Sequence, residues 1–151
     1  MKPIDDEKTI STNIELESRL KAEREQWNKD IISLIKSIDT TSKLSMAQVT
    51  QLSYRQIIQD KLVEYRILLE KRTANFDKLC QSRAKEYATG SELKLTNSER
   101  HSFAEIDHSA AKLQVKMLES QIKYLEECVK TLDNLGYAIK NKIEILTQQL
   151  F

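Results

Sequence analysis

Apolar side chains recur along this chain in steps of three and four residues, the spacing of one face of an α-helix. The clearest series lies in the last third of the chain, and Gly136 is its one member without a side chain. The members are Val115, Leu118, Ile122, Leu125, Val129, Leu132, Gly136, Ile139, Ile143, Leu146 and Leu150. We predict a long helix here that begins near Thr96, which forms a capping box with Glu99. Gly136 either lets two backbones approach closely or ends this helix.

A first helix is predicted in the N-terminal quarter. Residues 1–11 are expected to be frayed, with Ser11 or Thr12 as the cap of the helix. Its apolar series is Leu20, Trp27, Ile31, Leu34 and Ile38. Arg24 is the one polar intrusion. Residues 39–42 then interrupt the pattern, and their side chains offer cap oxygens for a new helix.

The second predicted helix runs from about Ser42 to Ala88. Its seam contains two arginines and consists of Ile58, Leu62, Tyr65, Leu69, Arg72, Phe76, Leu79 and Arg83. Gly90 suits a left-handed C-cap. The connector follows at 91–97, and residues 92–95 alternate, so a short edge strand there is an open alternative.

Composition supports an all-α fold. The 151 residues include two Gly and one Pro, whereas folds built of strands and turns use these residues at their turns. We predict long helices forming helical hairpins with coiled-coil packing. Residues 1–38 would be an N-terminal helical extension and residues 39–151 the functional domain. No apolar run approaches the length of a membrane span, so we expect no membrane contact.

A second apolar stripe lies beside the main series of the last third. It consists of Leu113, Met117, Tyr124, Cys128 and Leu135. Two stripes make a face wider than a two-stranded coil needs, so one would pack on the second helix and the other on a second copy of the chain. We therefore predict a homo-oligomer, as a ring or a bundle. The candidate oligomerisation residues are Leu118, Ile122, Leu125, Val129, Leu132, Gly136, Ile139, Ile143 and Leu146.

Charge is uneven along the chain although its formal total is +1. Residues 40–90 carry nine basic and five acidic side chains, so this segment is the candidate site for a polyanion. Lys71, Lys78 and Lys85 recur every seven residues and form one column on a helix. A solvated face with no ligand is the alternative. The candidate DNA-binding residues are Lys71, Arg72, Lys78, Arg83, Lys85, Tyr87 and Lys94.

Aromatic residues recur every eleven positions in the second predicted helix, at Tyr54, Tyr65, Phe76 and Tyr87. Eleven residues are close to three turns, so all four rings lie on one face. That face coincides with the apolar seam, and we expect the first three rings in the core. Tyr87, at the end of the helix, is a candidate for contact with a nucleic-acid base.

Signatures of catalysis are absent from the sequence: it has no Gly-rich phosphate loop, nucleophile elbow or Cys/His zinc pattern. His101, Glu105 and His108 lie on one side of a helix. The two histidines, however, are two turns apart, about 10 Å, which is too far for one ion. We expect no metal, no cofactor and no enzyme activity. Cys80 and Cys128 match no metal or redox spacing and are expected in the core.

Three motifs occur in order along the chain. They are residues 38–44 (IDTTSKL), residues 80–90 (CQSRAKEYATG) and residues 136–140 (GYAIK). In these motifs and their separations the chain resembles the UvsY family of recombination mediators of T-even-type phages. The resemblance covers about residues 38–147. The basic pair of the family before the Gly-containing turn corresponds to Arg83 and Lys85, which lie one position nearer the turn.

This resemblance implies an all-helical protein that forms a ring-like, open-barrel homo-oligomer, a heptamer in the best-known member. It implies binding of single-stranded DNA at the rim of the ring, displacement of single-strand-binding protein and loading of the phage recombinase. These steps belong to DNA recombination, repair and replication in the cytoplasm of an infected bacterial host. A coiled-coil scaffold or assembly protein without nucleic-acid binding is the alternative.

Overall fold

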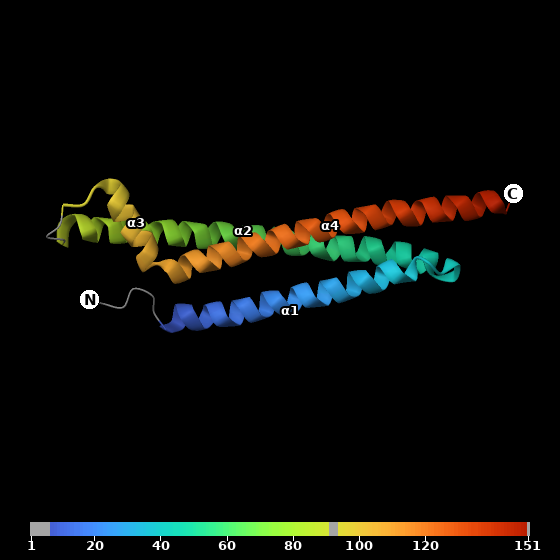
Figure 1. Cartoon of the computed structure of the whole chain (residues 1–151), viewed down its shortest axis with the longest axis horizontal. Helices are drawn as coiled ribbons and strands as arrows, with labels where there is room; N and C mark the ends of the chain where they lie inside the picture. Colours follow the sequence, from blue (N-terminus) through green and yellow to red (C-terminus); the bar gives the residue numbers. More distant parts are fainter. Residues whose placement is uncertain (1–6, 91–93, 151) are drawn as a thin grey trace. The chain divides into compact units, whose positions relative to one another are not determined.

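The computed structural model describes residues 7–90 and 94–150, which form helices and no strand (Figure 1). The all-α prediction is therefore confirmed for this part of the chain. No helix within these residues is long and apolar enough to cross a membrane. The elements are α1 (Glu7–Ser37), a 3₁₀ turn η1 (Thr41–Lys43), α2 (Leu44–Gly90), α3 (Asn97–Asp107) and α4 (Ser109–Gln149).

The start of α1 differs from the expected one. Helix is already present at Glu7, so the predicted cap at Ser11 or Thr12 and the fraying of residues 7–11 are wrong. Thr12 Oγ1 instead donates to the carbonyl oxygen of Lys8 at 2.8 Å. This bond satisfies the hydroxyl inside a helix without ending the helix. The predicted fraying of residues 1–6 lies outside the described residues.

The turn between α1 and α2 lies where the pattern break predicted it. Thr40 is extended (φ −100°, ψ 115°), but its side chain makes no cap bond. Backbone bonds close the turn instead, from Thr40 N to Ser37 O at 3.3 Å and from Lys43 N to Thr40 O at 3.0 Å. Lys142 Nζ donates to Ile38 O at 3.1 Å. A cation from α4 thereby satisfies a carbonyl just past the end of α1.

The end of α2 also differs from the expected one. Gly90 is the last helical residue, and no described glycine has a positive φ, so the predicted left-handed cap is wrong. A Cβ placed on Gly90 would meet no atom within 4 Å. The predicted strand at 92–95 falls partly on residues 91–93, which are not described. Lys94 and Leu95 have no regular secondary structure.

The predicted last helix is two helices. Its start is confirmed, because Thr96 Oγ1 accepts a hydrogen bond from Glu99 N at 3.2 Å. The helix ends at Asp107, and His108 (φ −111°, ψ 36°) separates α3 from α4. If the apolar series is continued from Val115 toward the N-terminus by one step of four residues and one of three, it reaches position 108. His108 is polar, so the apolar series is interrupted at the residue between α3 and α4.

Contacts divide the chain into two compact units. The first contains residues 7–19, 66–90 and 94–120, and the second contains residues 20–65 and 121–150. Segments of α1 contribute to both units. The division into an extension at 1–38 and a functional domain at 39–151 stays a prediction.

Large apolar side chains fill the core of the second unit. Leu125, Leu132 and Ile139 of α4 and Ile58 and Leu62 of α2 are almost entirely buried. Burying one such side chain contributes about 1.5–3 kcal/mol. The middle of the main apolar series of α4 is therefore covered within one chain. These side chains need no second copy to be shielded from water.

Two polar pairs help to set the register of the second unit. Arg24, the polar intrusion in α1, donates to Gln121 Oε1 of α4 at 2.6 Å. Tyr65 of α2 donates to Glu23 Oε2 of α1 at 2.6 Å. Buried polar groups stabilise a fold only when they are paired. These pairs therefore favour one alignment of the three segments.

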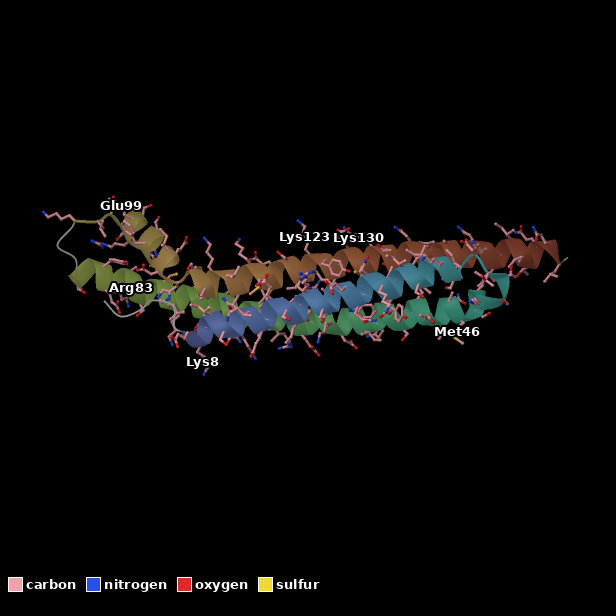
Figure 2. All side chains as sticks on the ribbon, turned by 60° about the horizontal axis from the view of Figure 1, so that its bottom comes forward. Lys8, Met46, Arg83, Glu99, Lys123 and Lys130 are labelled. Carbon is pink, nitrogen blue, oxygen red and sulfur yellow. The ribbon has the colours of Figure 1, made fainter. Side chains whose placement is uncertain are left out.

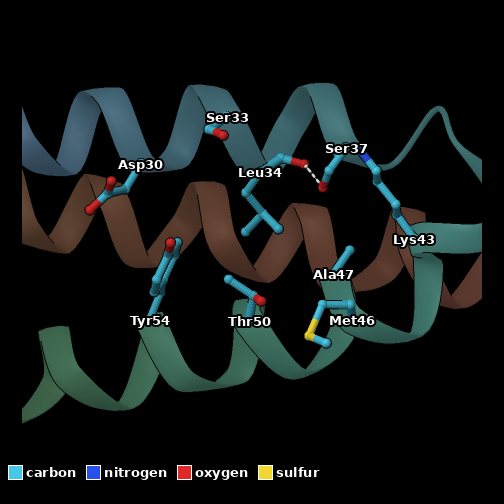
Figure 3. Close-up of a pocket in the computed structure, with 9 residues that line it drawn as sticks. All are labelled: Asp30, Ser33, Leu34, Ser37, Lys43, Met46, Ala47, Thr50 and Tyr54. Atoms are coloured by element: carbon cyan, nitrogen blue, oxygen red, sulfur yellow. Dashed lines mark hydrogen bonds between the residues drawn. The ribbon is translucent and has the colours of Figure 1, made fainter.

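A hollow of about 320 Å³ lies between α1 and α2 in the same unit (Figure 3). Leu34 of α1 and Thr50 and Tyr54 of α2 point toward one another across it. The Tyr54 ring also meets Trp27 edge-on, with the ring centroids 5.4 Å apart. The expectation that Tyr54 packs within the fold agrees with this contact.

The core of the first unit combines small side chains with Val115 and Leu118 of α4. Cys80, Ala104, Ala110 and Ala111 are buried there, and Asn13 Nδ2 of α1 donates to Ala110 O at 2.9 Å. Small side chains allow close helix packing but remove little apolar area from water.

Candidate nucleic-acid interface

Most of the predicted DNA-binding residues lie on the last part of α2. Lys71, Arg72, Lys78 and Lys85 are exposed, as is Lys94 in the connector. Within residues 7–90 and 94–150, the structure shows no ion pair for any of these five cations. Seven residues of helix span about 10 Å, so Lys71, Lys78 and Lys85 form a column of free cations. We call these three residues the lysine column.

Arg83 is placed differently from these lysines. Its Nε donates to Asp107 of α3 at 2.9 Å and its Nη1 to Glu86 at 2.6 Å. The Arg83 side chain is 20% exposed and that of Asp107 is 12% exposed. The hydrogen bond to Asp107, followed by the one to Glu86, raises the pKa of Arg83. Two carboxylates therefore compete with any phosphate for this guanidinium.

Tyr87 belongs to the same cluster. Its hydroxyl donates to Asp107 Oδ2. The Arg83 guanidinium lies 4.9 Å from the ring centroid, and the Phe103 ring lies 5.9 Å away at an angle of 42°. The hydrogen bond to Asp107, and then burial, raises the pKa of Tyr87. The ring thus links α2 to α3, and contact with a base remains a prediction.

Asp107 is the centre of this cluster. Burial by itself would raise the pKa of Asp107, but hydrogen bonds from Tyr87 and Arg83 outweigh it, and the pKa is lowered. The carboxylate consequently stays ionised and holds the end of α2 against α3. We call Arg83, Tyr87, Phe103 and Asp107 the Asp107 cluster.

Sequence reasoning missed Phe103 and Asp107. The available signal was a pair of residues four apart on each helix, Arg83 with Tyr87 and Phe103 with Asp107, and such pairs share a helix face. The short connector predicts a hairpin that brings these faces near each other. Which face meets which depends on the connector geometry, so the pairing could not be derived.

A hollow of about 290 Å³ lies between α2 and α3 in the same unit. Lys85, the last member of the lysine column, lines it from α2 together with Ala84 and Ala88. Asn97, Arg100 and His101 line it from α3. We call this site the α2–α3 hollow.

The sequence also singled out histidines with Glu105, as candidate metal ligands, and two cysteines. Glu105 pairs with Lys112 at 3.5 Å, and His108 forms the break before α4. Among the described residues, no group of three or more His, Cys, Asp or Glu could hold a metal ion. Cys80 and Cys128 are free and buried, and burial raises the pKa of both thiols. Both cysteines lie in the core, as predicted.

The predicted oligomerisation residues are mostly covered by their own chain. Leu118, Ile122, Leu125, Leu132 and Ile139 are buried, whereas Val129, Gly136, Ile143 and Leu146 are half-buried. Exposed large apolar side chains occur on all four helices, and those on α2 of the second unit are Met46, Val49, Leu52, Ile57 and Val63. Met46 points away from its helix in Figure 2. Contact between copies through the α4 series stays a prediction.

No family model, curated protein or solved structure matches the chain. The resemblance to UvsY-like recombination mediators therefore remains a sequence-based hypothesis. In the structure, its motif at residues 38–44 spans the turn between α1 and α2, and residues 80–90 are the last turns of α2. Residues 136–140 lie within α4.

Proposed function

We propose that this chain binds single-stranded DNA as a homo-oligomer and acts as a recombination mediator without catalysing a reaction. In this role it promotes loading of a recombinase in place of single-strand-binding protein. The observation that carries the DNA-binding part is the lysine column, whose three exposed ammonium groups form no ion pair within the described residues. The mediator role rests on the resemblance of the three motifs.

The binding mechanism is electrostatic and polyvalent. Ammonium groups about 10 Å apart along a helix pair with phosphates of a flexible strand and release its counterions, whatever the base sequence. One chain supplies few contacts and binds weakly. Several copies on one strand make each later contact intramolecular, which raises the total affinity.

The test of DNA binding compares two double variants. Lys71→Gln with Lys78→Gln removes two members of the lysine column. Lys123→Gln with Lys130→Gln removes two lysines of α4 with the same spacing, which project from α4 in Figure 2. The affinity of each variant for a labelled oligonucleotide is measured by fluorescence anisotropy at several salt concentrations. We expect the α2 variant to lower affinity and to reduce the log–log salt slope by about 1.4, at about 0.7 per contact.

The α4 variant should bind almost as the unaltered chain does. Equal losses in both variants would mean that only total charge matters, and would contradict the lysine column as the binding site. The mediator role has its own assay, strand exchange by a phage recombinase on DNA coated with single-strand-binding protein. Absence of stimulation there would contradict that role alone.

The alternative function is a coiled-coil scaffold or assembly protein, and the exposed apolar side chains of α2 favour it. Met46, Val49 and Leu52 step by three residues along one side of the helix and are all more than half exposed. A scaffold needs such a surface but no free cations. A gel shift with single-stranded DNA at modest ionic strength separates the two functions, because a scaffold leaves the DNA unshifted.

A further inference from the structure

The α2–α3 hollow combines two permanent cations with a histidine. Lys85 lines it from α2, and Arg100 and His101 line it from successive positions of α3. Of the described residues that line the hollow, none is acidic. Because like charges are brought together without a counter-charge, the site favours an anion.

Nearby carboxylates are already bound elsewhere. Glu86 accepts a hydrogen bond from Arg83 at 2.6 Å, and Glu99 accepts one from the Thr96 hydroxyl at 3.0 Å. Asp107 is held by the Asp107 cluster. Within residues 7–90 and 94–150, neither Lys85 nor Arg100 forms an ion pair with these carboxylates.

Arg100 adds an observation independent of charge. Its Nη1 donates to Asn97 Oδ1 at 3.2 Å, whereas its Nε is buried and has no hydrogen-bond partner among residues 7–90 and 94–150. A buried N–H without an acceptor is unfavourable, because it has lost its bonds to water. A small rotation of the guanidinium toward the hollow would give Nε an acceptor if an anion were present there.

We propose that the α2–α3 hollow binds one phosphate group of the DNA backbone. The planar guanidinium of Arg100 suits two parallel bonds to phosphate oxygens. Lys85 supplies a second charge and His101 a ring N–H. The site continues the lysine column, since Lys78 precedes Lys85 by two turns. The choice of DNA as the source of the phosphate rests on the proposed function, whereas the preference for phosphate rests on the hollow itself.

The first experiment uses inorganic phosphate and the full chain labelled with ¹⁵N. The Nε–Hε signal of Arg100 is identified by its absence in Arg100→Lys and followed by NMR during the titration. We expect this signal to shift and saturate, while the signal of Arg55, whose Nε is bonded to Asp133 at 2.6 Å, does not. Chloride at equal ionic strength is the control. No shift, or equal shifts with chloride, would overturn the proposal.

The second experiment measures oligonucleotide binding by Arg100→Gln with His101→Gln. Removal of one charge-assisted contact should lower affinity about tenfold or more and reduce the salt slope by about 0.7. Lys123→Gln with Lys130→Gln is the control variant, and unchanged helical circular dichroism verifies folding. Arg100→Lys, which keeps the charge but loses the planar fork, should give an intermediate affinity.

The two experiments separate failure of the hollow from failure of the proposed function. If Arg100 responds to phosphate but the chain binds no oligonucleotide, the hollow is a site for free phosphate and the proposed function is wrong. If the chain binds oligonucleotide while Arg100 is silent and the variant matches its control, the proposed hollow is wrong and the function stands.

Discussion

At the residue scale, Arg83 shows how a side chain that sequence reasoning assigns to a ligand can be bound by its own fold. A basic residue before a Gly-containing turn is a reasonable phosphate contact. In the structure, however, Asp107 and Glu86 already accept its hydrogen bonds. Exposed Lys85, two residues later, shows no such partner in the described part of the chain. We therefore expect Lys85 to contribute more to DNA affinity than Arg83.

Asp107 gives a prediction for stability. We expect Asp107→Asn to lower the free energy of unfolding near neutral pH by about 1.5–3 kcal/mol, since it weakens hydrogen bonds to a charged group. The lowered pKa of Asp107 means that its stabilisation is fully present above the ordinary aspartate pKa of about 4. It is lost as the pH falls through the lowered pKa of the folded state. Denaturant titrations at pH 7 and pH 3 should therefore show a difference between variant and unaltered chain that shrinks at the lower pH.

The matched control for Asp107→Asn is Glu127→Gln. Glu127 pairs with Lys130 at 3.0 Å, but both side chains are largely exposed. Exposed pairs contribute about 0–1 kcal/mol, so this variant should change stability little at either pH. Equal effects of the two substitutions would contradict the structural role given to Asp107.

At the element scale, the contact between α2 and α4 explains the glycine in the apolar series. The helix continues through Gly136, so this residue does not end it. A Cβ at this position would lie 3.0 Å from Nε2 of Gln51, a buried side chain of α2. The same Nε2 donates to Leu132 O at 2.9 Å. Gly136 therefore makes room for a hydrogen bond between the two helices.

This contact predicts that the effect of Gly136→Ala depends on Gln51. In the unaltered chain we expect a loss of about 1 kcal/mol in the free energy of unfolding. Disturbing a buried hydrogen bond costs about 1–3 kcal/mol and outweighs the gain of about 1 kcal/mol in helix propensity. In a Gln51→Ala background the same substitution should stabilise. Urea denaturation of the unaltered chain, the two single variants and the double variant measures the free energies of unfolding. If Gly136→Ala changed this free energy in the same direction in both backgrounds, the account would be contradicted.

The sequence pattern was sufficient to predict some helix boundaries but not others. Thr96 caps α3 as predicted, because the capping box is local and needs no other helix. The break at His108 and the helical state of Gly90 were not predicted. The break at His108 could not be derived, since one polar residue in a series is tolerated in one context and ends a helix in another.

At the scale of the whole molecule, assembly is the property on which the proposed mechanism depends. Leu125, expected at a contact between copies, is fully buried in its own unit. Leu125→Asp would therefore unfold the chain and reveal nothing about assembly. The exposed apolar side of α2 offers a cleaner test, because a surface substitution there leaves the core intact.

We expect Leu52→Lys to lower the mass of the assembly measured by light scattering while helical circular dichroism stays unchanged. Leu52 is 59% exposed, and a charge there opposes burial against a second copy. The matched control is Ile14→Lys on α1, at a position that is 65% exposed. A monomeric unaltered chain would contradict the homo-oligomer, and equal mass changes in both variants would contradict the use of α2.

The amino-acid pattern was enough to predict that this chain is built of helices, which side of each helix is apolar, and where the turn between α1 and α2 falls. These properties depend on spacing and local capping, which act over a few residues. The packing of the helices was needed to show that Leu125, Leu132 and Ile139 of α4 are buried within their own chain, that Asp107 binds Arg83, and that Lys85 and Arg100 line one hollow. Periodicity specifies a face of a helix but not its partner, since any complementary apolar face removes it from water equally well.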